Sequence, residues 1–180
     1  MKAFIGEIID PVKDFIKMRT KGEKIISVVI PVLAGLICVF VGTRVHPRYE
    51  FDLVEYSVDI LDQLLTILTL FISFSMAYLS ILLTSGSENV DGLKKYESNK
   101  YFLDKKACTL YQVLATEITY TIVFEIIFMV IVLIQRLILY VCSMKTIQVL
   151  LSLDIALFVH TLLMMLVVIK NIYYSFWKSK

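Results

Sequence analysis

The sequence contains few of the residues from which most catalytic and metal sites are built. Its 180 residues include three cysteines, two histidines and six glycines. Cys38, Cys108 and Cys142 form neither a close pair nor a metal-ligand spacing, which argues against a disulfide framework and a zinc site. The glycines are scattered, and neither a glycine-rich phosphate loop nor a nucleophile elbow is present. We therefore expect no catalytic residue, no metal and no cofactor, in a protein that is not an enzyme.

A surplus of charge of one sign is also missing. The formal net charge is +2 at neutral pH, which is too small to predict direct binding of a nucleic acid. The lysines and arginines gather near the ends of apolar runs. Their placement therefore says more about topology than their sum does.

Apolar residues are the abundant class, at 58% of the chain and with a mean hydropathy of +0.79. Soluble domains use about 45–50%. A bilayer core is spanned by about 20 residues of helix, and four apolar runs of that size are present. We predict an all-α polytopic membrane protein in which residues 1–24 precede a four-helix transmembrane domain of residues 25–180. The predicted spans are residues 25–43, 60–84, 112–134 and 146–169.

The lysine and arginine counts of the connecting segments predict the orientation. Residues 1–24 hold six, residues 84–111 five and residues 170–180 three, whereas the segments on the opposite side hold four in total. Short loops rich in these residues stay in the cytoplasm. We therefore expect a multi-pass protein of the cell inner (plasma) membrane with both termini and the loop of residues 85–111 on the cytoplasmic side.

The first 24 residues combine an apolar helical face with lysines that lie largely off that face. This pattern predicts an amphipathic helix lying on the cytoplasmic leaflet; the alternative is a helix packed on the cytoplasmic ends of the bundle. Pro11 after Asp10 predicts a break, with a second helix starting at the proline. The loop of residues 85–111 is expected to hold a short helix. Both segments are candidate contacts for a cytosolic partner protein.

A polar stripe follows one face of the second span at helical spacing. It begins in the preceding segment with Asp52 and Glu55. One interpretation is close helix packing through small and hydroxylated side chains. A second is a wet ion path between several copies, with acids at its outer mouth; a third is a solvated acidic surface. The candidate residues are Asp59, Asp62, Thr66, Thr69, Ser73, Ala77, Ser80 and Thr84.

Four ionisable residues fall inside the last two spans. Glu117 and Glu125 share one face of the third, and Asp154 and His160 lie in the fourth. Such residues usually face protein or water and mark functional paths. Counting along the antiparallel helices predicts that Glu125 and Asp154 lie near one level, where they could share a proton. The same counting also permits a Glu117–His160 pair; the alternatives are that Glu117 snorkels to the interface and that His160 is a satisfied core residue.

The layout of an amphipathic start, four spans, short loops and no soluble catalytic domain resembles small four-helix membrane proteins of bacterial anti-phage systems, such as the membrane component of the Kiwa system. The resemblance covers the whole chain in topology and transfers no functional residue. It implies an oligomer that disturbs or senses the bacterial inner membrane alongside a cytosolic partner.

We therefore expect a homo-oligomer that forms or gates an ion path, with cations as the preferred ions, in a defence or stress response. Thr66, Ser73 and Ser80 would line the path, and Asp59 with Asp62 would form its outer mouth. Glu125 and Asp154 would tune the bundle. The competing hypothesis is a non-conducting membrane scaffold or sensor that recruits the cytosolic partner.

Overall fold

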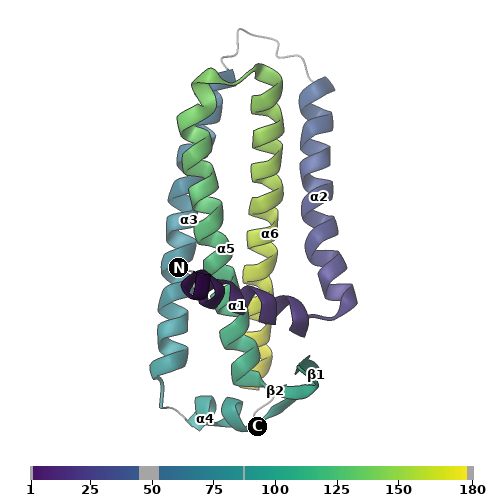
Figure 1. The fold of residues 1–180 in the computed structure, drawn as a ribbon, viewed down its shortest axis with the longest axis vertical. Coiled ribbons are helices and arrows are strands. Elements are labelled where there is room, and N and C mark those ends of the chain that lie inside the picture. Colours follow the sequence, from purple (N-terminus) through teal and green to yellow (C-terminus); the bar gives the residue numbers. More distant parts are fainter. Residues whose placement is uncertain (1, 45–52, 87, 178–180) are drawn as a thin grey trace.

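Four long helices run side by side and alternate in direction along the chain (Figure 1). The computed structural model describes residues 2–44, 53–86 and 88–177. All four helices are long and apolar enough to cross a membrane, which confirms the predicted number of candidate spans. They are α2 (Lys21–Arg44), α3 (Leu53–Thr84), α5 (Leu110–Ile138) and α6 (Met144–Trp177).

The helices are longer than the predicted spans because the apolar run marks only the part that needs lipid. Backbone hydrogen bonding continues through polar flanks, as at Glu55 and Asp59, which lie on α3 as expected. α6 likewise continues past residue 169 to Trp177. Asp52, the expected first acid of the stripe, lies outside the described residues.

Large apolar side chains cover the outside of the bundle. Ile37 of α2 is 63% exposed, Phe74 of α3 65% and Leu137 of α5 78%. An apolar surface this extensive requires a non-aqueous cover. The helix lengths and this surface together describe a multi-pass membrane protein.

The bundle core lies where α3 and α5 face each other. Leu61 and Leu68 of α3 and Phe128 and Val132 of α5 are fully buried there. This core extends to the end of the bundle where a short 3₁₀ helix, η1 (Leu139–Val141), leads from α5 toward α6. We call that end the turn end.

Helix α2 packs on α6 through small residues. A Cβ atom added at Gly35 would lie 3.0 Å from the Ser152 carbonyl oxygen and 3.1 Å from the Ala156 Cβ atom. Glycine therefore permits the close approach of the two helices, which is the usual means of helix association in lipid.

Helix α1 (Lys2–Met18) crosses the long helices instead of running along them (Figure 1). Its Phe15 and Met18 side chains are buried. Phe15 stacks on Tyr120 of α5, with 3.8 Å between ring centroids. The predicted break at Pro11 is wrong, because the helix continues through it. A proline there removes one backbone hydrogen bond, and the packing of the following turns outweighs that loss.

Residues 85–111 form more structure than the expected short helix. The helix is α4 (Glu88–Lys95), and the strands β1 (Glu97–Leu103) and β2 (Lys106–Thr109) follow it as an antiparallel hairpin. Asp104 and Lys105 make the turn with positive φ angles of 48° and 70°, as a two-residue hairpin turn requires. We call this end of the bundle the hairpin end (Figure 1).

Candidate functional site

The four predicted intramembrane polar residues are placed among different neighbours. Glu117 and Asp154 are 1% exposed and Glu125 is fully buried, while His160 is partly buried. An unpaired charge in the hydrocarbon interior costs about 3 kcal/mol or more. The partners of each group therefore decide what it can do.

Glu117 is the centre of a polar cluster at the hairpin end. The Asn171 side-chain nitrogen on α6 donates to both Glu117 carboxylate oxygens, at 2.8 and 2.6 Å. The guanidinium of Arg19, between α1 and α2, lies 3.5 Å from Glu117 Oε1 and is itself buried. The Arg19 guanidinium also covers the Phe15 ring at 4.6 Å. One carboxylate thus joins α5, α6 and the α1–α2 junction.

His160 contacts a backbone carbonyl oxygen of α2 that a proline leaves without its helical hydrogen bond. Pro31 has no N–H, so the Ser27 carbonyl oxygen four residues earlier loses its helical donor. His160 Nδ1 lies 2.9 Å from that oxygen, and its Nε2 lies 2.9 Å from the Tyr120 hydroxyl. Because the carbonyl can only accept, Nδ1 carries the proton and Nε2 accepts from Tyr120.

The structure contains these contacts in place of the Glu117–His160 pair that the helix counting permitted. Glu117 bonds Asn171 and Arg19, whereas His160 bonds the α2 backbone and Tyr120. Glu117 is packed inside protein instead of snorkelling. His160 corresponds to the alternative of a satisfied core histidine, since both ring nitrogens have partners.

Glu125 and Asp154 lack the hydrogen bonds and ion pairs that satisfy Glu117 and His160. Glu125 faces Ser75 of α3, and Asp154 faces Gln135 of α5. Within the part of the chain that is described, none of the four carboxyl oxygens makes a hydrogen bond of good geometry. An acid that is buried without a donor is most stable as the neutral, protonated form.

The two carboxyl groups do not lie at one level. Asp154 faces Gln135, which is ten residues beyond Glu125 on α5. Ten helical residues rise about 15 Å. The expected shared proton between Glu125 and Asp154 is therefore not supported, because the antiparallel helices pair in a different register from the one counted.

The hydroxyl stripe of α3 lies on the outer surface of the chain. Every one of its eight predicted members is exposed, on the side opposite Leu61, Leu64 and Leu68. Its hydroxyl groups donate to the carbonyl oxygens one turn earlier, such as Ser73 to Thr69 at 2.8 Å and Ser80 to Met76 at 2.9 Å. Their donors are thus satisfied within α3, while their oxygens can still accept.

Asp62, at the acidic end of the stripe, is paired. The Arg136 guanidinium on α5 donates to both Asp62 carboxylate oxygens, with 3.0 Å between Nη2 and Oδ2. Both side chains are about half exposed. The negative charge of Asp62 is therefore partly neutralised at the turn end.

The hairpin is tied to the start of α2 by a second polar cluster. Thr20 and Glu23 form a capping box, with Glu23 N 3.4 Å from Thr20 Oγ1 and Thr20 N 3.2 Å from Glu23 Oε2. Lys100 Nζ and the Tyr101 hydroxyl of β1 donate to Glu23 Oε1, at 2.6 and 2.9 Å. The bond to the Glu23 carboxylate raises the pKa of Lys100.

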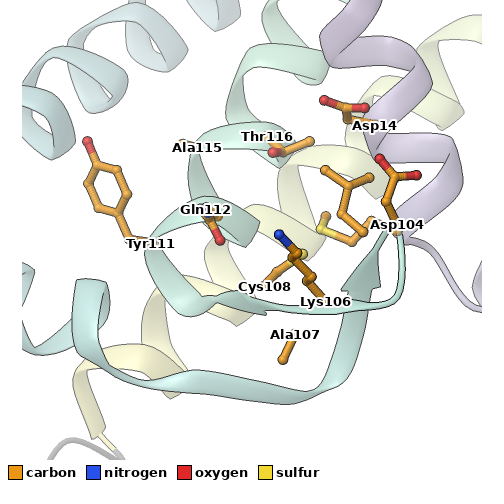
Figure 2. Close-up of a pocket in the computed structure, with 11 residues that line it drawn as sticks. Asp14, Asp104, Lys106, Ala107, Cys108, Tyr111, Gln112, Ala115 and Thr116 are labelled. Atoms are coloured by element: carbon orange, nitrogen blue, oxygen red, sulfur yellow. The ribbon is translucent and has the colours of Figure 1, made fainter.

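A groove of about 550 Å³ lies between α1, the hairpin and the first turns of α5 (Figure 2). Asp14 of α1 and Asp104 of the hairpin turn lie on the same side of it in Figure 2. Cys108 lies on its wall, and burial raises the pKa of that thiol. Lys17 of α1 pairs with Asp104 at 3.7 Å, so the groove is bordered by an ion pair that joins α1 to the hairpin.

The partners that complete these clusters were not predicted from the sequence. Arg19 was counted only among the positive charges that set the orientation, and Asn171 and Gln135 were not identified as candidates. Two signals are available in the sequence. Thr20-x-x-Glu23 is a capping-box pattern. Pro31 inside an apolar helix predicts that the Ser27 carbonyl oxygen lacks its helical donor.

Comparison of the chain with protein-family models, with curated proteins and with solved structures finds no match.

We predict that Glu117→Ala destabilises the protein by about 3–5 kcal/mol, because it leaves the buried Arg19 guanidinium unpaired. Removing both groups in Arg19→Met with Glu117→Leu should recover most of that loss. Thermal unfolding in detergent measures both variants, with exposed Glu97→Ala as control. A double variant no more stable than Glu117→Ala would contradict the pairing.

We also predict that the cost of replacing His160 depends on Pro31. His160→Leu should destabilise the native chain by about 1–3 kcal/mol, since the Ser27 carbonyl is left without a donor. In a Pro31→Ala background the backbone N–H that the substitution restores can bond that carbonyl, so the same replacement should cost less. Unfolding of the four chains forms a double-mutant cycle, and strictly additive effects would refute the assignment.

Proposed function

We propose that the chain is a homo-oligomeric multi-pass protein of a bacterial inner membrane that forms or gates a cation path between its copies. The observation that carries this proposal is the α3 stripe. The stripe follows an outer face of α3 from Asp59 to Thr84, and its hydroxyl groups run from Thr66 to Thr84. Hydroxyl oxygens with free lone pairs can replace part of the hydration shell of a cation.

The interior of one chain offers no alternative path between the described parts of α3 and α5. Leu61, Leu68, Phe128 and Val132 fill the space between these helices and are fully buried. We therefore place a wet path across the whole bundle between copies. Several α3 helices facing one another would supply one.

We place the hairpin end in the cytoplasm, following the excess of lysine and arginine in residues 1–24, 84–111 and 170–180. Helix α1 would then lie in the plane of the cytoplasmic leaflet. Exposed Ile9 and Ile16 would face lipid, and exposed Lys13 and Lys17 would face head groups. This arrangement satisfies both descriptions of α1, an interfacial helix and a helix packed on the bundle.

The turn end would form the outer mouth of the path. Arg136 neutralises part of the charge of Asp62, so Asp59 would contribute more than its neighbour to attracting cations. The role in defence or stress rests on the topological resemblance to membrane components of anti-phage systems.

Assembly through the stripe predicts that Ser73→Leu converts the oligomer to smaller species, because a bulky side chain prevents close approach of the α3 helices. Ser73→Ala keeps the small size and should leave the oligomer intact. Native mass measurement after gentle detergent extraction compares the two. Equal masses for wild type and Ser73→Leu would remove the basis of the proposal.

Ion selectivity gives a second expected outcome. In liposome flux, Asp59→Asn should lower the preference for cations over anions, since it removes a negative charge from the mouth. Arg136→Gln should raise that preference by exposing the charge of Asp62. The exposed lysine variant Lys95→Gln, at the other end of the bundle, is the control. A higher preference with Asp59→Asn, or a lower one with Arg136→Gln, would overturn the assignment of the mouth.

The second candidate function is a non-conducting scaffold or sensor. The folded α4–hairpin unit favours it, because Lys100 and Tyr101 fix this unit to the α1–α2 junction. A scaffold would never leak ions from liposomes and would lose its partner when Glu23→Ala releases the hairpin. Flux from wild-type protein separates the two candidates.

A further inference from the structure

A second groove lies between α3, α5 and α6 in the half of the bundle nearer the hairpin end. Its volume is about 350 Å³, within the range of about 300–1,000 Å³ found for ligand pockets. It opens beside Phe74 and Ile169, which are 65% and 57% exposed. The lining is mainly apolar, with hydroxyl groups from Ser75, Tyr78 and Thr121.

Glu125 adjoins this groove through two neighbours, although its own side chain is not among the lining residues. Thr121, one helical turn before it on α5, lines the groove, and Ser75, the side chain that Glu125 faces, lines it as well. Farther from Glu125, the wall residues Tyr78, Ile118 and Ile172 pack against the cluster that contains Leu93 of α4. The groove thus leads from the neighbours of a fully buried carboxyl group toward the hairpin end.

The groove can hold water. A water molecule takes about 30 Å³ and needs polar partners, and the three hydroxyls provide them along one route. The Thr121 hydroxyl donates to the Glu117 carbonyl oxygen at 2.8 Å, which leaves its oxygen free to accept. Asp154 is also buried, but neither it nor Gln135, the side chain that it faces, lines this groove.

We propose that Glu125 is a proton-binding carboxyl group that exchanges its proton with the hairpin end through the water-filled α3–α5–α6 groove. The acid is neutral at rest, because no cation among the described residues faces it: α3 contributes Ser75 and Tyr78, and the α6 wall is Met165, Val168, Ile169 and Ile172. On α5, Glu117 lies two turns away with its own partners, Arg19 and Asn171.

The proposal goes beyond the ion path between copies and does not depend on it. It concerns a site inside a single chain, on the side of α3 that faces the bundle. Proton binding by Glu125 would persist in a monomer. A failed test of assembly therefore leaves it standing, and the converse also holds.

Infrared spectroscopy of the full chain in lipid nanodiscs tests the proposal, since a protonated carboxyl group has its own carbonyl stretching band. At neutral pH, Glu125→Gln should remove one such band and Asp154→Asn another. After transfer to D₂O, the Glu125 band should shift well before the Asp154 band, because only Glu125 has neighbours that line a groove. Ser73→Leu, outside the groove, should change neither band.

Filling the groove should slow the exchange of the Glu125 band. Ser75→Leu and, independently, Ile169→Trp each place apolar volume there, so one variant remains informative if the other does not fold. The proposal is overturned if Glu125→Gln removes no band, since Glu125 is then ionised. It is equally overturned if the Glu125 band exchanges no faster than that of Asp154, or if filling the groove leaves its exchange rate unchanged.

Discussion

The hydrocarbon interior of a bilayer offers no water, so a backbone group or a charge that would face it needs a partner from protein. His160 meets this constraint for the Ser27 carbonyl that Pro31 leaves without a donor, and it fixes α2, α5 and α6 together in doing so. Glu117 meets it by holding Asn171 and Arg19. The arrangement of the helices follows from these few contacts at least as much as from apolar packing, since lipid competes for every apolar surface.

The buried polar contacts gather toward the hairpin end, whereas the core toward the turn end is formed by leucine, valine and phenylalanine. Arg19 and Glu23 lie at the α1–α2 junction and bind Glu117 of α5 and Lys100 of β1, respectively. A displacement of this junction would therefore disturb Glu117 directly.

The sequence predicted the four long helices and placed Glu125 and Asp154 within the last two of them, because apolar run length is a local property. It could not predict the hairpin, whose strand of residues 97–103 lacks a regular apolar alternation. The partners of the buried polar side chains could not be predicted either. The partners of Glu117 come from positions 19 and 171, and the relative height of Glu125 and Asp154 depends on a helix register that only packing sets.

One face remains unexplained by contacts within the chain, and the central claim is that other copies cover the α3 stripe. Cysteine cross-linking in membranes tests it most directly, after Cys38, Cys108 and Cys142 are replaced by serine or alanine. Mild oxidation should link Ser73→Cys chains to each other, whereas Ile37→Cys, also exposed but on α2, should stay unlinked. Absence of cross-linking at Ser73→Cys, with efficient linking at Ile37→Cys, would contradict the account and place the stripe against lipid.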